Sequence, residues 1–249
     1  MSTLEFWVVA GIAAFLMGVS KGGIPMLAML SVPLMSLFME PAMAAGLLLP
    51  LYIVADWYAV YLFRKTFSAR NLAIMLPGAA AGVAVAYLTV SHVPGNVVKL
   101  VVAAIGLSYL VSALRQRFAR RLPLPRPADV PRGLFWGALA GLTSYISHAG
   151  GPPFQAYILP QRLEKMVYLG TTTIFFAAVN LMKLPPFVLA GQITRESLSQ
   201  AAWVAPFALL GAWTGARISR ILPERIFFMV IEIALGVVSL KLLWEVFVA

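Results

Sequence analysis

Residues 18–25 read GVSKGGIP and interrupt an apolar run that extends from residue 4 to residue 39. Residues 147–153 read SHAGGPP and interrupt a second apolar run, from residue 133 to residue 163. Paired glycines adopt backbone conformations that other residues resist, and proline is favoured in the first turn of a helix. We therefore predict that each run forms two helices joined by a break, with Pro25 and Pro153 near the start of the second helix. Each half has about 15 residues, or about 22 Å as a helix, which is marginal for a full span.

The composition of the whole chain is that of a membrane protein. Hydrophobic residues make up 61% of the 249 residues, charged residues make up 11%, and the mean hydropathy is +0.89. This number of polar side chains is too small to cover a water-facing surface. We therefore predict an all-α integral membrane protein in a lipid bilayer. Full spans of about 20 residues are predicted at 41–63, 70–91, 94–116, 166–190, 196–217 and 223–247.

The positive charge of the chain does not indicate a nucleic-acid partner. The net charge of +10 comes from short clusters of Lys and Arg between apolar runs, which is typical of cytoplasmic loops. Cysteine is absent, which excludes disulfides and Cys-based metal sites. No motif of a metal-dependent, nucleotide-binding or hydrolytic enzyme is present. We therefore predict no catalytic residues, no metal and no cofactor.

The chain reads as two related halves. A stretch rich in Arg and Pro near the midpoint separates a first repeat, residues 1–116, from a second, residues 132–249, with residues 117–131 as a basic cytoplasmic linker. Both halves contain a break, and a further set of landmarks recurs at the same spacing: Pro77, Gly82 and Pro94 in the first half, and Pro206, Gly211 and Pro223 in the second. This pattern predicts an internal duplication.

Loop charge indicates that the two halves have opposite orientations. If each broken segment is a re-entrant hairpin, the inverted arrangement places 14 of the 19 Lys and Arg residues on the cytoplasmic side, and the parallel one places only 11 there. We therefore predict a polytopic bundle of two inverted repeats, each with a broken hairpin and three spanning helices.

The two breaks are the candidate substrate site. Non-helical backbone at membrane depth is tolerated where it is buried in protein or lines a wet cavity, and the N-terminus of a half-helix attracts anions. A lysine at that depth also needs a partner or a cavity. The candidate substrate-binding residues are Ser20, Lys21, Gly22, Gly23, Ser147, His148, Gly150, Gly151, Gln155, Thr171, Thr172 and Asn180. The alternative reading of the breaks is that they are kinks that ease helix packing.

Two charged residues inside spans receive a different interpretation. Asp56 would repel an anion unless it is protonated or paired, so we assign it to coupling or to structure, with Lys21 or Lys183 as its partner. Lys183 lies three residues after Asn180, on the same face of a helix, and receives the same assignment.

The two breaks, the region of Asp56, Leu76-Pro77-Gly78 and Gly170-Thr171-Thr172 together resemble the TauE/SafE-type sulfite exporter family, also called the TSUP transporters. The resemblance extends over nearly the whole chain. It implies a multi-pass transporter of the bacterial inner membrane, with two related halves, that moves sulfite, thiosulfate, sulfoacetate or another organosulfur anion.

We therefore predict a secondary transporter that binds a small anion between two opposed half-helix N-termini and works by alternating access. Because no ATP-binding module is present, the energy would come from an ion gradient, with a proton or a sodium ion as the coupling ion, from the substrate gradient or from a separate partner. Two alternatives stay open. One is a gated anion channel with the same site, and the other is a membrane-embedded accessory protein in which the breaks serve packing alone.

Overall fold

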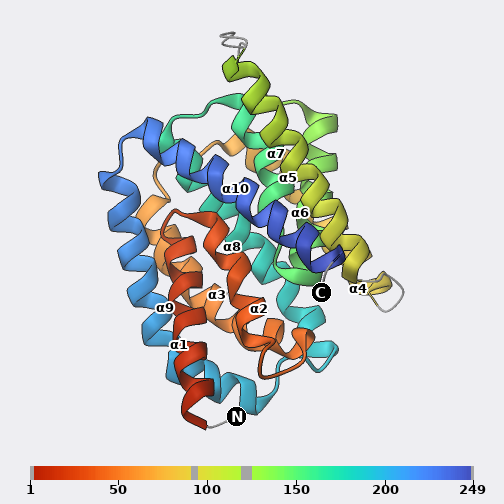
Figure 1. Ribbon diagram of the computed structural model, residues 1–249, viewed down its shortest axis with the longest axis vertical. Helices are drawn as coiled ribbons and strands as arrows, with labels where there is room; N and C mark the ends of the chain where they lie inside the picture. The colour runs from red at the N-terminus through yellow and green to blue at the C-terminus, as the bar shows by residue number, and fades with distance from the viewer. Residues whose placement is uncertain (1–2, 91–94, 119–124, 248–249) are drawn as a thin grey trace. The chain divides into compact units, whose positions relative to one another are not determined.

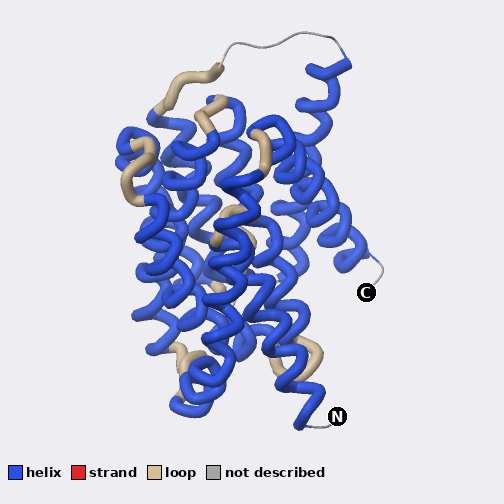
Figure 2. Tube along the Cα trace, turned by 90° about the vertical axis from the view of Figure 1, so that its left-hand side faces the viewer, coloured by secondary structure: helices blue, strands red, loops and turns tan. Residues whose placement is uncertain are grey.

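The computed structural model describes residues 3–90, 95–118 and 125–247, and every element within these ranges is a helix (Figures 1 and 2). The elements, in chain order, are α1 (Thr3–Lys21), η1 (Pro25–Leu30), α2 (Ser31–Met35), α3 (Pro41–Phe63), α4 (Ala69–Thr89), α5 (Gly95–Phe118), α6 (Val130–Ser147), α7 (Gly151–Ile158), η2 (Leu159–Gln161), α8 (Lys165–Leu189), α9 (Arg195–Ile221) and α10 (Glu224–Phe247). Elements η1 and η2 are 3₁₀ helices. Pro94 and part of the predicted linker lie outside the described residues.

Five of the described helices are long and apolar enough to cross a membrane, which confirms an all-helical membrane protein. They are Leu4–Lys21, Pro41–Phe63, Ala69–Thr89, Lys165–Leu189 and Glu224–Phe247. The last four coincide with predicted spans. The spans predicted at 94–116 and 196–217 are helical, as α5 and α9, but they are not among these five. In α9, charged residues at both ends and Ser, Gln, Thr and Gly between them lower the hydropathy.

Both interrupted runs break where the sequence predicts, but their halves are unequal. Helices α1 and α6 have 19 and 18 residues, longer than predicted, and the pieces that follow them are shorter. The first break turns at Gly23, with φ of 130°, and the second at His148, with φ of 53°. After the first break the chain forms a 3₁₀ helix rather than the predicted α-helical half. Pro33, which has no backbone N–H to donate, lies in the first turn of α2, where no such donor is needed.

The chain folds into two compact units, and each unit takes segments from both halves of the sequence. Unit 1 comprises Met1–Phe67 and Leu169–Pro223, and unit 2 comprises Ser68–Tyr168 and Glu224–Ala249. Unit 1 therefore holds the first break with α1, α3 and α9 and most of α8. Unit 2 holds the second break with α4, α5, α6 and α10.

In unit 1, α1 and α9 pack in direct backbone contact through glycines. A Cβ on Gly18 would overlap the carbonyl oxygen of Ala208, and one on Gly22 would overlap that of Ala212. In the opposite sense, Gly211 and Gly215 face the backbone of α1. The contacts advance in the same direction along both helices, so the helices are parallel. Each contributes a Gly-xxx-Gly pair, which lets membrane helices approach closely.

Unit 2 contains a helix pair of the same construction. Gly78 and Gly82 of α4 lie against the carbonyl oxygens of Leu134 and Ala138 in α6, and Gly137 and Gly141 of α6 lie against the backbone of α4. These helices are also parallel, and both carry the Gly-xxx-Gly spacing. Each unit therefore contains one pair of parallel helices in close backbone contact through glycines.

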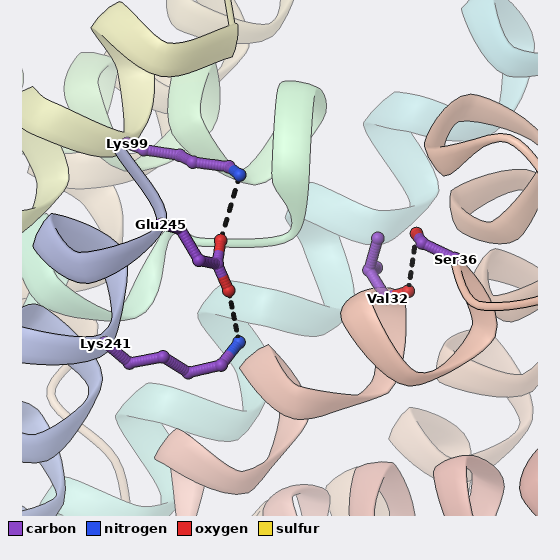
Figure 3. A network of polar contacts seen from close by, with 5 residues as sticks. All are labelled: Val32, Ser36, Lys99, Lys241 and Glu245. Atoms are coloured by element: carbon purple, nitrogen blue, oxygen red, sulfur yellow. Dashed lines mark hydrogen bonds and ion pairs between the residues drawn. The ribbon is translucent and has the colours of Figure 1, made fainter. Parts of the chain in front are cut away.

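Two further pairs run antiparallel, one in each unit. In unit 1, Gly46 of α3 lies against Gln192, just after α8, and Gly170 of α8 lies against Thr66, just after α3. The two contacts are reciprocal. In unit 2, α5 and α10 are joined by Glu245, whose carboxylate oxygens lie 2.9 Å from Lys99 Nζ and 2.6 Å from Lys241 Nζ (Figure 3).

Candidate functional site

Lys21, the last residue of α1, forms a buried ion pair with Asp56 of α3. Its Nζ lies 2.6 Å from Asp56 Oδ1, and the two side chains are 9% and 3% exposed. The lysine occupies this position because α1 continues up to the glycines of the first break. An ion pair at this depth stabilises a fold only when its charges are well compensated, because desolvation of each ion is costly.

Asn180 of α8 completes the environment of the carboxylate. Its Nδ2 donates a hydrogen bond of 2.6 Å to Asp56 Oδ2, and its side chain is buried. Asp56 stands at the same spacing from Gly46 as Asn180 does from Gly170. The glycines make the reciprocal contacts of α3 and α8. The hydrogen bond therefore joins two corresponding positions of an antiparallel helix pair.

Lys183 lies one turn beyond Asn180 on α8, and its side chain is completely buried. Tyr52 lies one turn before Asp56 on α3, and both lysines lie over its ring. Lys21 Nζ is 5.0 Å and Lys183 Nζ is 6.0 Å from the ring centroid. Lys21 Nζ is also 5.7 Å from the ring of Phe176. The described interior of unit 1 thus gathers two lysines and one carboxylate around aromatic rings, which attract cations.

Tyr52 also links this group, which we call the lysine cluster (Lys21, Tyr52, Asp56, Asn180 and Lys183), to the broken segment. The Tyr52 hydroxyl donates a hydrogen bond of 3.0 Å to the carbonyl oxygen of Ala28 in η1. Nearby, the hydroxyl of Ser31 donates to the carbonyl oxygen of Ala13 in α1. A movement of η1 would therefore also shift the ring of Tyr52, which lies beside both lysines.

The glycines of the first break are fixed by α9. The hydroxyl of Ser219 lies 2.9 Å from the carbonyl oxygen of Gly22, and a Cβ on Gly23 would come within 2.7 Å of that hydroxyl. Sequence reasoning predicted Gly22 and Gly23 but missed Ser219 and Tyr52. Tyr52 could have been found from its i, i+4 spacing to Asp56. Ser219 gives no such signal, because its partner is distant in sequence.

We expect Ser219→Ala to lower stability, because the buried carbonyl of Gly22 loses its side-chain donor. A loss of about 1–2 kcal/mol corresponds to a fall of roughly 3–6 °C in the midpoint of thermal denaturation, measured on the detergent-purified protein. Thr214→Ala is the control, because the exposed Thr214 hydroxyl bonds only within α9, to the carbonyl of Leu210. Equal midpoints for the two variants would contradict this role of Ser219.

Among the other predicted residues of unit 1, Ser20, Thr171 and Thr172 are buried. Thr171 and Thr172 lie in the second turn of α8, and Thr172 is one turn before Phe176, whose ring is 5.7 Å from Lys21 Nζ. In the same turn, Gly170 is packed against Thr66. The part of Thr171 and Thr172 in substrate binding stays a prediction.

The residues predicted from the second break all lie in unit 2. His148 is buried and follows the last residue of α6, Ser147, whose hydroxyl donates to the carbonyl of Thr143. Helix α7 begins at Gly151, directly after Gly150. Gln155 is only 1% exposed, and neither atom of its side-chain amide has a hydrogen-bond partner within the described residues. Such a buried amide is costly unless a water or a ligand meets it.

The described residues contain no group of three His, Asp or Glu side chains that could hold a metal ion. The lysine cluster combines charge compensation with a neutral donor and aromatic rings beside its ammonium groups.

Comparison with known families gave one match. The family model described as Sulfite exporter TauE/SafE matches residues 9–242, which is nearly the whole chain. Comparison with curated proteins and with solved structures gave no significant match.

Proposed function

Because the chain belongs to the sulfite exporter TauE/SafE family, whose members are membrane transporters of sulfur-containing anions, we propose that it carries sulfite, thiosulfate or an organosulfonate such as sulfoacetate. The binding position we propose is the lysine cluster of unit 1. The observation that carries this proposal is the presence of two buried lysines beside one buried carboxylate.

The charge of the lysine cluster supports an anionic ligand. When its groups are ionised, the lysine cluster holds two positive charges, on Lys21 and Lys183, and one negative charge, on Asp56. Two ammonium groups this close to the same ring repel each other, and an anion bound between them would be attracted by both. The amide of Asn180 and the hydroxyl of Ser20 are neutral donors that could orient the oxygens of such a ligand.

Two inverted repeats, residues 1–116 and 132–249 with the linker 117–131 between them, form the transport framework in this proposal. Corresponding helices of an inverted duplication are expected to run antiparallel where they meet. The antiparallel pairs α3/α8 and α5/α10, and the reciprocal contacts of Gly46 and Gly170, support this arrangement. Alternating access would then follow from movement of one repeat against the other.

The remaining candidates keep the roles that the sequence suggested. Gly22 and Gly23 give the backbone its turn beside Lys21, while Thr171 and Thr172 line the start of α8. In unit 2, Ser147, His148, Gly150, Gly151 and Gln155 surround the N-terminus of α7, a feature suited to an anion. We propose the bacterial inner membrane as the location, on the strength of the family.

Uptake into proteoliposomes tests this function directly. The panel is sulfite, thiosulfate, sulfoacetate, taurine, phosphate and acetate. We expect saturable uptake of at least one sulfur anion, inhibited by other sulfur anions and accelerated by the same anion on the opposite side, as a carrier requires. Flux that neither saturates nor responds to the opposite side would indicate a channel. An absence of both binding and flux for the whole panel would indicate an accessory protein.

A further inference from the structure

The carboxylate of Asp56 already occupies the position where an anion would contact Lys21. Lys21 Nζ has Asp56 Oδ1 at 2.6 Å, the ring of Tyr52 at 5.0 Å and the ring of Phe176 at 5.7 Å, and its side chain is 9% exposed. Little room is left around the ammonium group for a second anion. A ligand can reach Lys21 closely only if Asp56 moves away from it.

We propose that Asp56 is an exchangeable counter-ion: it releases Lys21 to the transported anion and takes up one proton from water as it does so. The inference rests on the proposed function and adds to it the coupling ion, because each anion bound at Lys21 would then be accompanied by a proton.

The surroundings of Asp56 require the proton. The titratable groups that act on this carboxylate, among the described residues, are Lys21 from α1, Tyr52 from α3 itself and Lys183 from α8. The broken segment and α9, which also pack on α3, contribute apolar side chains to this core: Val32, Met35, Ala201, Val204 and Ala208. With a dianion such as thiosulfate bound beside Lys21 and Lys183, an ionised Asp56 would leave one excess negative charge in these surroundings, so the carboxylate is expected to become neutral.

Asn180 is suited to hold Asp56 in both protonation states. It now donates through Nδ2 to Asp56 Oδ2. After rotation of its amide, the carbonyl oxygen of the same side chain could accept a hydrogen bond from the protonated carboxyl. A lysine or arginine at this position could only donate, and would hold the aspartate in its charged form. The side-chain amide of Asn180 can therefore hydrogen-bond to Asp56 whether Asp56 is ionised or protonated.

Proton uptake on binding is the test. Thiosulfate is the probe, because it is a dianion that takes up no proton itself near neutral pH. Calorimetric titration of the detergent-purified protein, in two buffers with different heats of ionisation, gives the number of protons bound per anion. We expect about one in the wild type, with affinity that rises about tenfold for each unit by which the pH falls.

The variant Asp56→Asn tests whether anion binding can occur without proton uptake. The variant should bind the anion without proton uptake and without pH dependence, and about tenfold more tightly than the wild type at pH 8, because Lys21 has lost its internal competitor. Glu245→Gln is the matched control, since Glu245 also forms ion pairs with lysine, here with Lys99 and Lys241, but lies in unit 2 (Figure 3). It should keep the wild-type proton uptake.

Two results would overturn the inference: anion binding by the wild type without proton uptake, or continued proton uptake by Asp56→Asn. The wild-type measurement decides by itself if Asp56→Asn fails to fold. Failure of the wild type to bind any sulfur anion would instead contradict the proposed function.

Discussion

Replacement of Lys21 by methionine is expected to abolish anion transport. Methionine keeps much of the length and apolar character of the lysine side chain but removes the ammonium group, which lies 2.6 Å from Asp56 Oδ1. The anion loses its cation, and Asp56 remains buried without its ion-pair partner. Loss of one member of a buried pair lowers the stability by about 3–5 kcal/mol. Truncation of a buried charge that pairs with a ligand costs about 2–5 kcal/mol of binding, so we expect anion binding at least about 30-fold weaker, with uptake into proteoliposomes below detection.

A matched lysine and a double variant separate binding from folding in this experiment. Lys99→Met removes a more exposed lysine from the ion pair with Glu245 in unit 2 and should leave uptake close to the wild-type rate. Lys21→Met combined with Asp56→Asn removes both members of the buried pair. It should recover thermal stability relative to Lys21→Met without recovering anion binding. Wild-type uptake by Lys21→Met would remove Lys21 from the substrate site.

The second large effect is expected from Gly18→Ala. The added methyl group would overlap the carbonyl oxygen of Ala208, and neither backbone can yield without separating α1 from α9. Overpacking of this kind costs up to about 3 kcal/mol or more, which corresponds to a fall of roughly 10 °C in the denaturation midpoint. We expect the purified variant to show this fall and to lose transport, since α1 carries Lys21.

Gly11→Ala provides the control in the same helix. A Cβ on Gly11 would meet the ring of Phe207 at 3.8 Å, an ordinary contact, and alanine favours the helical state over glycine. Its midpoint should equal or exceed that of the wild type. If Gly18→Ala behaves like Gly11→Ala, the close approach of α1 and α9 does not limit stability.

Local features of this fold could be predicted from the sequence because they depend on short-range chemistry. The glycines at both breaks and the apolar runs of α3, α4, α8 and α10 indicated the positions of these elements. The pairing of Lys21 with Asp56 was one of two partners considered, since a buried acid in this chain has few cations within reach. The lengths of α1 and α6 were underestimated, because apolar periodicity does not show how far a helix continues into a Gly-Gly sequence.

The long-range packing could not be predicted in the same way. Gly18, Gly22, Gly211 and Gly215 show the Gly-xxx-Gly spacing in the sequence, but the spacing does not say which helix will be the partner. The role of Tyr52 depends equally on tertiary structure, because Lys21 and Lys183 reach its ring from helices far apart in the chain. The charge of the candidate site therefore emerged only once three helices were placed together.

The division of unit 1 between two distant stretches of chain has a consequence for biosynthesis. Helix α1 is synthesised before its glycine-packed partner α9, and more than half of the 249 residues lie between them. During that interval α1 would hold a lysine within the lipid. Asp56 is synthesised early enough, in α3, to neutralise that lysine long before Asn180, Lys183 and α9 exist. The ion pair of Lys21 with Asp56 would thus compensate the buried lysine charge during membrane insertion, before α8 and α9 pack against these helices.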